Sequence, residues 1–540
     1  MNARVSLPAK AHLVGSGIAS LAAAVYLVKD AGVVPEKITI YEAEAGFGGA
    51  MTKAMKTGPG TPTPPGFGYV LPATRILDRE YRCTYDLFSH FRSVSDRQES
   101  IHEDVLEFNR TYPYEDGARL LDAAGRVVSS KHFGVSFADR VNLLLLLLRS
   151  EASLEGKPIS DFFSLHFYES EFWIAWSSMM GPLPEHSAIE MRRYLVRFLH
   201  VLPDVLSMTS VWRMRMNQYD SVAAPLHDWL VGQGVSFETD AFVDDVEFDS
   251  NAGAVAATSM SVKSGAGDRT VAVDPEHDVV LMTLGSQVAD MTIGSMTSAA
   301  QKRNPPGRSW ALWAKIAATH PEFGKPEAFF GPDIVPHAMW VTFTVTTYEP
   351  TFYECLAMRT NSGSRQTGLV TLVDSPWLIT VAPFPEPHFA GQSPLTKVWW
   401  GYGIHPMEAG RHVNGKAMHE CSGSEILKET VLEFGFGDKL PAILASSDCV
   451  PCVLPYAGSV WMVRRKADRP KVIPDGAKNF AFIGQFCEIP KDTMFTMEYS
   501  VRSARTAVSG LFGLPDETPP VYEGWKDLRA VGAAIRTFLL

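Results

Sequence analysis

The stretch from Lys10 to Glu42 constrains the fold more than any other part of this chain. It contains a short apolar run, a tight glycine turn, an alanine- and leucine-rich segment, and a second apolar run that ends in an acid; these are Ala11–Val14, Gly15–Gly17, Ser20–Val28 and Lys37–Glu42. A strand, a glycine turn, a helix and a second strand in this order predict a βαβ unit near the start of an α/β domain.

The same residues predict a dinucleotide site. Gly15 permits the turn, and Gly17 lets the backbone approach a pyrophosphate, which the first N–H groups of the helix would bind. Glu42 would accept hydrogen bonds from an adenosine ribose. Ser20 stands where a third glycine is usual, and it is also small enough for a close contact between helix and strand. The alternative is a purely structural α/β turn.

A second glycine-rich segment follows the acid. Gly48 and Gly49 end the run Ala43-Glu-Ala-Gly-Phe-Gly-Gly, a few residues beyond Glu42. This arrangement resembles the GR2-type FAD proteins, such as the amine oxidases and phytoene desaturases, in which the second glycine pair lets the backbone pass close to the flavin. The resemblance favours FAD over NAD as the cofactor.

Composition limits the remaining function classes. A chain of 540 residues predicts two or three domains. The formal net charge of −11, without any basic cluster, argues against a nucleic-acid partner. Cys449 and Cys452 have CxxC spacing, but no second pair completes a zinc site, so we expect structural cysteines and no metal. Neither a signal peptide nor a run of about 20 apolar residues is visible in the sequence, so we expect a cytoplasmic protein.

Helical patterns are concentrated in the first 200 residues. Residues 56–70 are rich in proline and glycine and predict a loop, either a wall of the site or a plain surface connection. The apolar spacing in residues 75–92 predicts a helix, and helical patterns dominate from Phe137 to about Leu202. Two interpretations are open for the aromatic residues between Phe162 and Trp176. They belong to the hydrophobic core, or they line an apolar tunnel together with Met179 and Met180.

Strand patterns fill much of the rest of the chain. The predicted strands are Val235–Thr239, Ala241–Phe248, Ala254–Val262, Asp278–Thr283, Leu369–Val373, Trp377–Val381, Lys397–Tyr402 and Asn479–Ile483. Ligands of doubly wound sheets bind at the carboxyl ends of the strands. A helix is predicted from Thr496 to Leu511. We therefore expect the following residues at the cofactor: Gly285, Ser286, Gly484, Thr496, Val243 and Phe495.

The last residues, Trp525 to Leu540, predict an amphipathic helix. Apolar residues at Leu528, Val531 and Ile535 alternate with basic residues. Such a helix either docks on the body of the protein or makes peripheral contact with a membrane.

By its motifs the chain resembles the oleate hydratases, once labelled myosin-cross-reactive antigens. The blocks that carry this resemblance are Asp86-Leu-Phe, His186-Ser-Ala-Ile-Glu-Met-Arg-Arg-Tyr-Leu, Asn217-Gln-Tyr-Asp-Ser, Thr283-Leu-Gly-Ser, Trp399-Trp-Gly-Tyr-Gly, Glu420-Cys-Ser-Gly-Ser-Glu-Ile and Phe482-Ile-Gly-Gln-Phe-Cys-Glu through Phe495-Thr-Met-Glu-Tyr-Ser. The resemblance covers Gly15 to about Leu511. It implies a GR2-type FAD-binding Rossmann-like domain, a mixed-sheet substrate domain and a helical region.

The family's reaction adds water to a cis double bond of a free fatty acid, oleate to 10-hydroxystearate, without net electron transfer. The resemblance places the proton-donating tyrosine at Tyr194, whose alternative role is an ordinary helix–helix contact. An arginine of the family's catalytic segment falls on Arg75. The family's water-activating acid falls on Ile76, which cannot orient water by hydrogen bonding, so Asp78 is the nearest alternative acid.

Other family positions also differ here. Ala382 and Phe384 occupy the places of a Thr-x-Asn pair that contacts the reaction centre elsewhere in the family. The fatty acid carboxylate needs a cation or several donors, for which Asn217, Gln218 and His388 are candidates, together with Arg213 and Arg215. We therefore expect a divergent subfamily with altered substrate length or double-bond position.

The predicted domain division follows these assignments. It comprises an FAD-binding domain in three parts (1–75, 206–300 and 431–515), a mainly helical substrate-tunnel region (76–205), a substrate-binding domain (301–430) and a tail helix (516–540). The expected partners are an unsaturated free fatty acid and water, in a monomer or homodimer. A flavin oxidoreductase and a non-catalytic fatty acid- or flavin-binding protein are the alternatives to a hydratase.

Overall fold

The structure is a computed structural model of the chain. It describes residues 10–51, 54–55, 68–74, 76–95, 98–114, 119–251, 253–301, 308–361, 368–515 and 518–538. Arg75 and residues 56–67 of the predicted loop lie outside the described residues.

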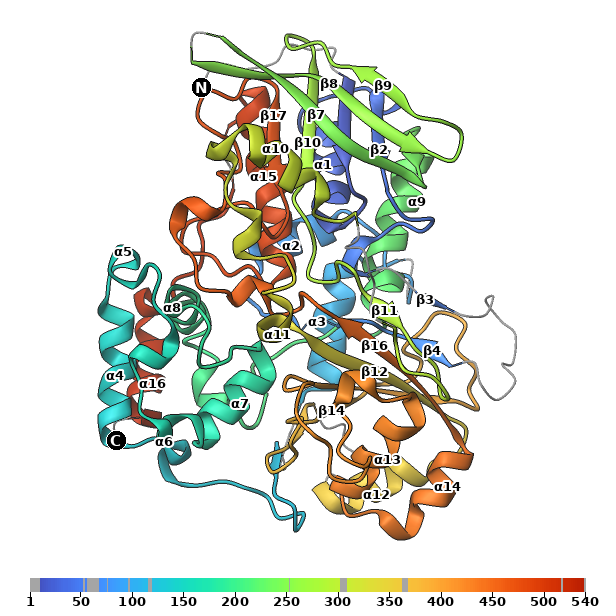
Figure 1. The fold of residues 1–540 in the computed structure, drawn as a ribbon, viewed down its shortest axis with the longest axis vertical. Helices are drawn as coiled ribbons and strands as arrows, with labels where there is room; N and C mark the ends of the chain where they lie inside the picture. The colour runs from blue at the N-terminus through green and yellow to red at the C-terminus, as the bar shows by residue number, and fades with distance from the viewer. Residues whose placement is uncertain are drawn as a thin grey trace.

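A five-stranded parallel sheet forms the part of the molecule at the top of Figure 1. Its order is β17 (Phe480–Ile483), β10 (Asp278–Thr283), β1 (Lys10–Val14), β2 (Ile38–Tyr41) and β6 (Ser236–Glu238). Helix α1 (Ile18–Lys29) packs against α15 (Met497–Phe512) and α9 (Ala224–Gln233). Nine consecutive residues of α1 are buried because the segment is almost entirely apolar. The predicted βαβ unit is confirmed.

A three-stranded antiparallel sheet lies beside the parallel sheet. It consists of β7 (Ala241–Asn251), β8 (Ala254–Ser264) and β9 (Arg269–Ala272), with α10 (Ala311–Thr319) against β7. Strands β7 and β8 begin where predicted and run two or three residues further than predicted.

A seven-stranded, mainly antiparallel sheet forms the lower part of the molecule in Figure 1. Its order is β11 (Thr292–Ile293), β16 (Ser447–Leu454), β12 (Trp340–Thr347), β15 (Lys397–Gly403), β14 (Thr380–Pro383), β13 (Val370–Leu372) and β5 (Leu120–Leu121). The helices α12 (Thr351–Thr360), α13 (Gly423–Glu433) and α14 (Leu440–Ala445) contribute to a second hydrophobic cluster on this sheet. Short pieces nearby are β3 (Ala54–Met55), β4 (Tyr69–Val70) and α11 (Val335–Ala338).

Strand β16 differs from the predicted division. Residues 431–515 were placed with the first sheet, whereas β16 pairs along its whole length with β12 of the seven-stranded sheet. The strand carries Cys449 and Cys452, which are buried free cysteines. The domain boundaries as a whole stay a prediction.

Helices from the first half of the chain form the third part of the molecule. They are α4 (Phe137–Leu148), α5 (Glu151–Leu154), α6 (Leu165–Tyr168), α7 (Glu171–Met180) and α8 (Ala188–Arg197). Two earlier helices lie in the middle of the molecule instead, where α2 (Arg82–Ser89) packs against α15 and α3 (Ile101–Thr111) packs against α2. The helix predicted over 75–92 was too long at its start. Residues 76–81 are not helical, because Leu77 exchanges backbone hydrogen bonds with Trp212 (2.7 and 2.9 Å), and this long-range bridge overrides the local pattern.

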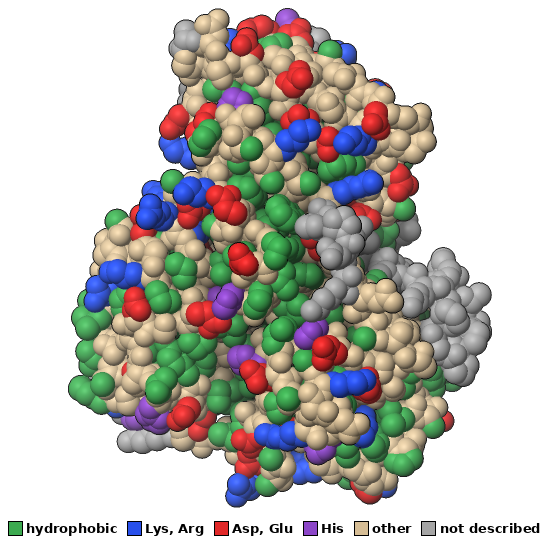
Figure 2. Space-filling model, viewed as in Figure 1, with side chains coloured by type: hydrophobic (Ala, Val, Ile, Leu, Met, Phe, Trp, Pro, Cys, Tyr) green, Lys and Arg blue, Asp and Glu red, His purple; other side chains and the backbone are tan. Residues whose placement is uncertain are grey.

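The C-terminal segment packs on the helical part. Helix α16 (Leu528–Phe538) buries Ala530 and packs Val531 and Ala534 against the core, while Leu528 and Ile535 face solvent. Figure 2 shows hydrophobic side chains on the surface of this part of the molecule. Among the helices in the described residues, none is long and apolar enough to span a membrane.

Candidate functional site

The larger of two neighbouring cavities lies at the carboxyl ends of β1, β10 and β17. It encloses about 1740 Å³, part of it open to solvent. Nine residues predicted to bind the cofactor line it: Gly15, Gly17, Glu42, Gly49, Val243, Gly285, Ser286, Gly484 and Thr496. Three others do not. Ser20 is buried in α1, Gly48 donates its N–H to Ser16 Oγ, and Phe495 lines the second cavity.

Two of these glycines have steric reasons to be glycine. Gly15 has φ +88°, and a Cβ there would lie 2.5 Å from Thr283 Oγ1. That hydroxyl donates a hydrogen bond to the Val14 carbonyl (2.8 Å), so it cannot move away without losing this bond. Gly49 has φ +55°, and its Cβ would lie 2.9 Å from Gly17 Cα. The two glycine segments therefore meet in van der Waals contact.

The Glu42 carboxylate joins the two glycine segments. Its Oε2 accepts hydrogen bonds from the backbone N–H of Ser16 (3.0 Å) and from Ser16 Oγ (2.5 Å). Ser16 Oγ in turn accepts a bond from the N–H of Gly48 (3.0 Å). Helix α1 starts at Gly17 without a side-chain cap, which suits an anion at its N-terminus. These residues fit a dinucleotide in chemistry and shape.

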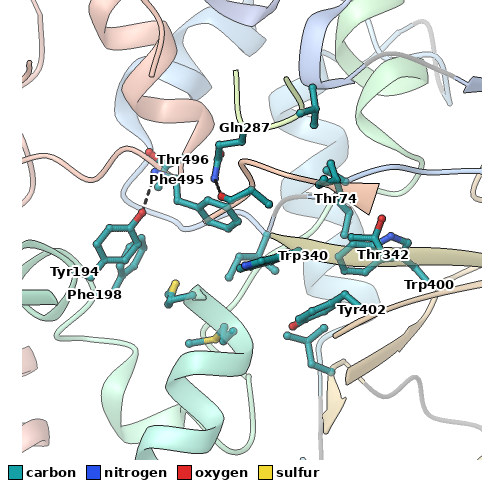
Figure 3. Close-up of a pocket in the computed structure, with 18 of the residues that line it drawn as sticks. Thr74, Tyr194, Phe198, Gln287, Trp340, Thr342, Trp400, Tyr402, Phe495 and Thr496 are labelled. Carbon is teal, nitrogen blue, oxygen red and sulfur yellow. Dashed lines mark hydrogen bonds between the residues drawn. The ribbon is translucent and has the colours of Figure 1, made fainter. Parts of the chain in front are cut away.

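The second cavity adjoins the first and shares Val288 and Thr496 with it. Its empty space is about 780 Å³, part of it open to solvent, and it is lined mainly by aromatic and aliphatic side chains. Figure 3 shows Tyr194 on one side of this apolar cavity, and Trp340, Thr342, Trp400 and Tyr402 from β12 and β15 on the other. Ile76, Tyr194, Phe495, Met179 and Met180, all singled out from the sequence, line it. The aromatic residues Phe163, Phe167, Phe172, Trp173 and Trp176 are core instead.

Tyr194 is held from two directions. It lies on α8 with only 1% of its surface exposed, and its ring packs 4.2 Å from that of Trp461. Its hydroxyl oxygen accepts a hydrogen bond from the backbone N–H of Phe495 (2.8 Å), just before α15 (Figure 3). An N–H donor at this oxygen would stabilise a phenolate at this position.

Ion pairs of the buried Arg193 guanidinium fix both sides of this contact. Arg193 on α8 pairs with Glu488 (2.6 Å) and Glu151 (2.8 Å), and its guanidinium also donates to the Ile489 carbonyl. Glu488 in addition pairs with Arg469 (2.8 Å). The network ties α8, which carries the tyrosine, to the segment that leads to the Phe495 amide.

Most polar side chains of the apolar cavity bond to backbone carbonyls. Thr342 Oγ1 donates to Pro72, Trp400 Nε1 to Leu71, the Tyr402 hydroxyl to Ser178 and Thr496 Oγ1 to Thr493. These donors stabilise the walls of the cavity.

Gln287 is a polar residue of the cavity that the sequence analysis missed. Its Nε2 donates to the Ala457 carbonyl (2.7 Å), and its Oε1 accepts a bond from Gln485 Nε2 (2.5 Å). Gln485 lines the cofactor cavity, so the amide pair connects the two cavities. Gln287 directly follows Gly285 and Ser286, which are predicted to lie at the cofactor. This position in the sequence is the signal that could have identified Gln287 as a site residue.

Asp78, the alternative acid, does not line either cavity. Its carboxylate lies 2.7 Å from His200 Nε2 and 3.6 Å from Arg197 Nη1. Burial alone would raise the pKa of Asp78, but the hydrogen bond and charge of His200 and the charge of Arg197 lower it below its ordinary value. Asp78 is therefore directed into an ion-pair cluster.

The residues considered for the fatty acid carboxylate are not brought together in the apolar cavity. Ala382, Phe384, His388 and Asn217 do not line it, and Gln218 lines the cofactor cavity. The His388 ring stacks on Phe384 at 3.6 Å, and burial together with the charge of Arg213 lowers its pKa to about 3. Asn217 donates twice to the His388 carbonyl (2.9 Å each).

The two arginines near this segment also have partners within the chain. Arg213 lies 3.8 Å from the Tyr114 ring and donates to the Tyr112 carbonyl, and Arg215 pairs with Asp104 (2.9 Å).

The model of the MCRA family matches residues 8–509. The chain belongs to this family. It is 32% identical over 526 residues to the oleate hydratase of Streptococcus pyogenes serotype M49 (strain NZ131), covering 95% of this chain and 87% of that protein. It is 28% identical over 546 residues to the linoleate hydratase of Lactiplantibacillus plantarum, covering 95% of each. The resemblance to the oleate hydratases is confirmed, and the hydratase names of both relatives agree with the predicted hydro-lyase class.

Solved structures show the same fold at low sequence identity. Putrescine oxidase bound to putrescine has a TM-score of 0.54 at 12% identity, covering 94% of this chain and 99% of the other. Cyclohexylamine oxidase from Brevibacterium oxydans IH-35A has a TM-score of 0.53 at 12% identity, covering 94% of this chain and 99% of the other. The predicted fold, a Rossmann-like α/β domain with a mixed-sheet domain and a helical region, is confirmed.

Proposed function

We propose that this protein is a fatty acid hydratase that holds FAD in the larger cavity and adds water to a cis double bond in the apolar cavity. The observation that carries the proposal is the Tyr194 hydroxyl, which accepts the Phe495 N–H inside an apolar cavity that adjoins a dinucleotide cradle. The oleate and linoleate hydratases that this chain resembles supply the reaction class.

FAD fits the larger cavity through three features of the chain. Gly15 and Gly17 leave room for a pyrophosphate at the start of α1, Glu42 lies where its carboxylate would accept hydrogen bonds from a ribose, and Gly49 keeps the second glycine segment close. Bound there, FAD would shape and electrostatically tune the adjoining wall of the apolar cavity, and the overall reaction would leave its redox state unchanged.

Tyr194 is the proposed acid. Its O–H bond breaks as the proton is transferred to one alkene carbon, and the oxygen of a water forms a bond to the other carbon. A proton from that water then restores the tyrosine, so that the sum is addition of H and OH. The Phe495 N–H lowers the cost of the phenolate in an apolar cavity, where a bare charge would be strongly unfavourable.

Gln287 is the proposed water-positioning group, in place of the acid that Ile76 cannot supply. A neutral amide oxygen has two lone pairs, so it can accept a bond from Gln485 and one from a water. Its fixed orientation, set by Gln485 and the Ala457 carbonyl, would align the water in the cavity that Ile76 and Tyr194 share. Asp78 is not used, since its carboxylate is occupied by His200.

The test is turnover in oxygen-18 water. FAD-loaded protein is incubated with oleate under reducing conditions, and the fatty acids are analysed by mass spectrometry. Hydroxystearate that carries one oxygen-18 is the expected result. Absence of a hydroxylated product from oleate and from a panel of other unsaturated fatty acids, with FAD still bound, would refute the proposal. Anaerobic bleaching of the flavin by substrate would identify an oxidoreductase instead.

A further inference from the structure

Tyr81 lines the apolar cavity and has no part in the reaction described above. It is 2% exposed and lies directly before α2, in the segment that starts at Ile76. Within the described residues its hydroxyl forms no hydrogen bond, and it is not closed off from open space as the hydroxyl of Tyr85 is, which is buried without a partner. A hydroxyl that opens into a cavity takes its hydrogen bonds from what occupies that cavity.

The Tyr81 side chain has a defined position. Its backbone N–H donates to the Asp78 carbonyl (3.1 Å), and its own carbonyl accepts the N–H of Tyr85 (2.9 Å). The Arg197 guanidinium lies 5.4 Å from the centre of the Tyr81 ring, a cation–π contact, and is itself fixed by a hydrogen bond to the Glu80 carbonyl (3.0 Å). The hydroxyl is therefore carried by a ring that is held from both the backbone and one face.

Tyr81 stands beside the end of α8, the helix that carries Tyr194. The same Arg197 guanidinium lies 5.6 Å from the centre of the Phe198 ring, and the Phe198 and Tyr194 rings are 5.9 Å apart. Figure 3 shows Tyr194 and Phe198 together on one side of the cavity. This series of contacts places Tyr81 and Tyr194 near each other in the cavity wall.

A water in an apolar cavity requires at least two polar partners. The Gln287 amide supplies one of them in the proposed reaction. A phenol supplies both an acceptor oxygen and a donor, and neither is used by the described protein at Tyr81. Burial, and after it the charge of Asp78, raises the pKa of Tyr81 well above its ordinary value, so the hydroxyl stays neutral. A neutral oxygen that accepts a hydrogen bond from water leaves a lone pair of the water free to attack carbon.

We propose that the Tyr81 hydroxyl is the second group that holds the reacting water, opposite the Gln287 amide. This inference rests on the proposed function and extends it. The water donates one O–H to the Tyr81 oxygen while its own oxygen bonds to the alkene carbon. The proton that the water loses restores Tyr194, so Tyr81 ends as it began. The segment that carries Ile76 then supplies a neutral hydroxyl to the water, although it lacks the predicted acid.

Tyr81→Phe tests the proposal with FAD-loaded protein and oleate under reducing conditions. Because the hydroxyl has no partner in the described protein, the melting temperature and the FAD content should stay unchanged. The kcat of hydration should fall about 100-fold, the effect of a misplaced reactant, while KM stays the same. Tyr85→Phe is the matched control, since it deletes a buried, unbonded hydroxyl that lines neither cavity, and its kcat should equal that of wild type.

A crystal structure with bound stearate supplies a measurement that does not depend on turnover. We expect an ordered water within hydrogen-bond distance of the Tyr81 hydroxyl and Gln287 Oε1, and its loss in Tyr81→Phe. A wild-type kcat in Tyr81→Phe, or no water at this hydroxyl, would overturn the inference and leave the proposed function standing. A raised KM with unchanged kcat would overturn it too, since the hydroxyl would then bind the fatty acid carboxylate. Failure of the proposed function differs from all of these, because wild-type protein itself would form no hydroxylated product.

Discussion

Replacing Tyr194 by Phe separates a catalytic hydroxyl from a structural one. The substitution removes the acceptor of the Phe495 N–H at 2.8 Å and leaves the packing of the ring on Trp461 in place. A buried N–H without an acceptor costs about 1–3 kcal/mol of folding free energy. Loss of a general acid slows the reaction about 10²–10⁴-fold, which corresponds to roughly 2.7–5.4 kcal/mol in the barrier.

A matched control lies in the same cavity. The Tyr402 hydroxyl donates to the Ser178 carbonyl, so Tyr402→Phe also deletes one buried hydroxyl with one backbone partner. Both variants should lose a similar amount of stability in urea unfolding, because each leaves one backbone group unpaired. The hydration rate should collapse only in Tyr194→Phe, with FAD content retained in both.

The result that refutes this reasoning is equally specific. If the two variants lose the same fraction of the hydration rate, Tyr194 acts through packing and the proton comes from another group. If Tyr194→Phe loses FAD as well as rate, its contact with Phe495 supports the cofactor cavity, and the rate of that variant says nothing about proton transfer.

Three other substitutions test separate parts of the structure. Glu42→Ala should lower the FAD released on denaturation, since the ribose loses its acceptor, whereas exposed Glu36→Ala should not; full FAD retention would remove Glu42 from the site. Arg193→Met leaves the buried Glu488 carboxylate and the partly buried Glu151 carboxylate without this partner and should cost about 3–5 kcal/mol in urea unfolding, several times the cost of Arg192→Met. The pKa of His388 is about 3 in the folded protein and about 6.5 in the unfolded chain. Below about pH 6.5 the unfolded chain therefore binds a proton that the folded protein does not, so the free energy of unfolding of the wild type falls by about 1.4 kcal/mol for each pH unit of acidification. His388→Gln should therefore lose less stability between pH 7 and pH 5 than wild type, and identical slopes would contradict the buried neutral ring.

Local signals predicted the parallel sheet well because each of its parts is recognisable alone. The run before Gly15, the apolar strand before Gly484 and the helix capped by Thr496 are all short patterns with distinct ends. Strand β16 was missed because Ser447-Asp-Cys-Val-Pro-Cys-Val-Leu has neither clean alternation nor a continuous apolar run. It is a strand because β12 and β11 pair with it from both sides.

The features of the site that could not be predicted depend on contacts between segments that are far apart in the sequence. Gln287 and Gln485 are 198 residues apart, and neither sits in a pattern that indicates an amide pair. Phe495 is predicted at the cofactor, yet its side chain lines the other cavity and its N–H donates to the Tyr194 hydroxyl. Phe495 lines the apolar cavity alone, whereas the adjacent Thr496 lines both cavities, a difference that spacing alone does not reveal.

An isoleucine at position 76, where the resemblance to the oleate hydratases predicts an acid, is consistent with the rest of the apolar cavity. A carboxylate at this position would be a buried charge, which requires a cation or several donors nearby. The cavity offers little of either, since the hydroxyls and indole of Thr342, Trp400 and Tyr402 already donate to backbone carbonyls. An apolar residue at 76 avoids that electrostatic cost, and in the proposed reaction a neutral group would then have to hold the water. The Gln287 amide, fixed at the wall between the two cavities, meets that requirement, and its orientation depends on Gln485 in the cofactor cavity. In this arrangement a bound cofactor would influence hydration by setting the position of a water, with no exchange of electrons.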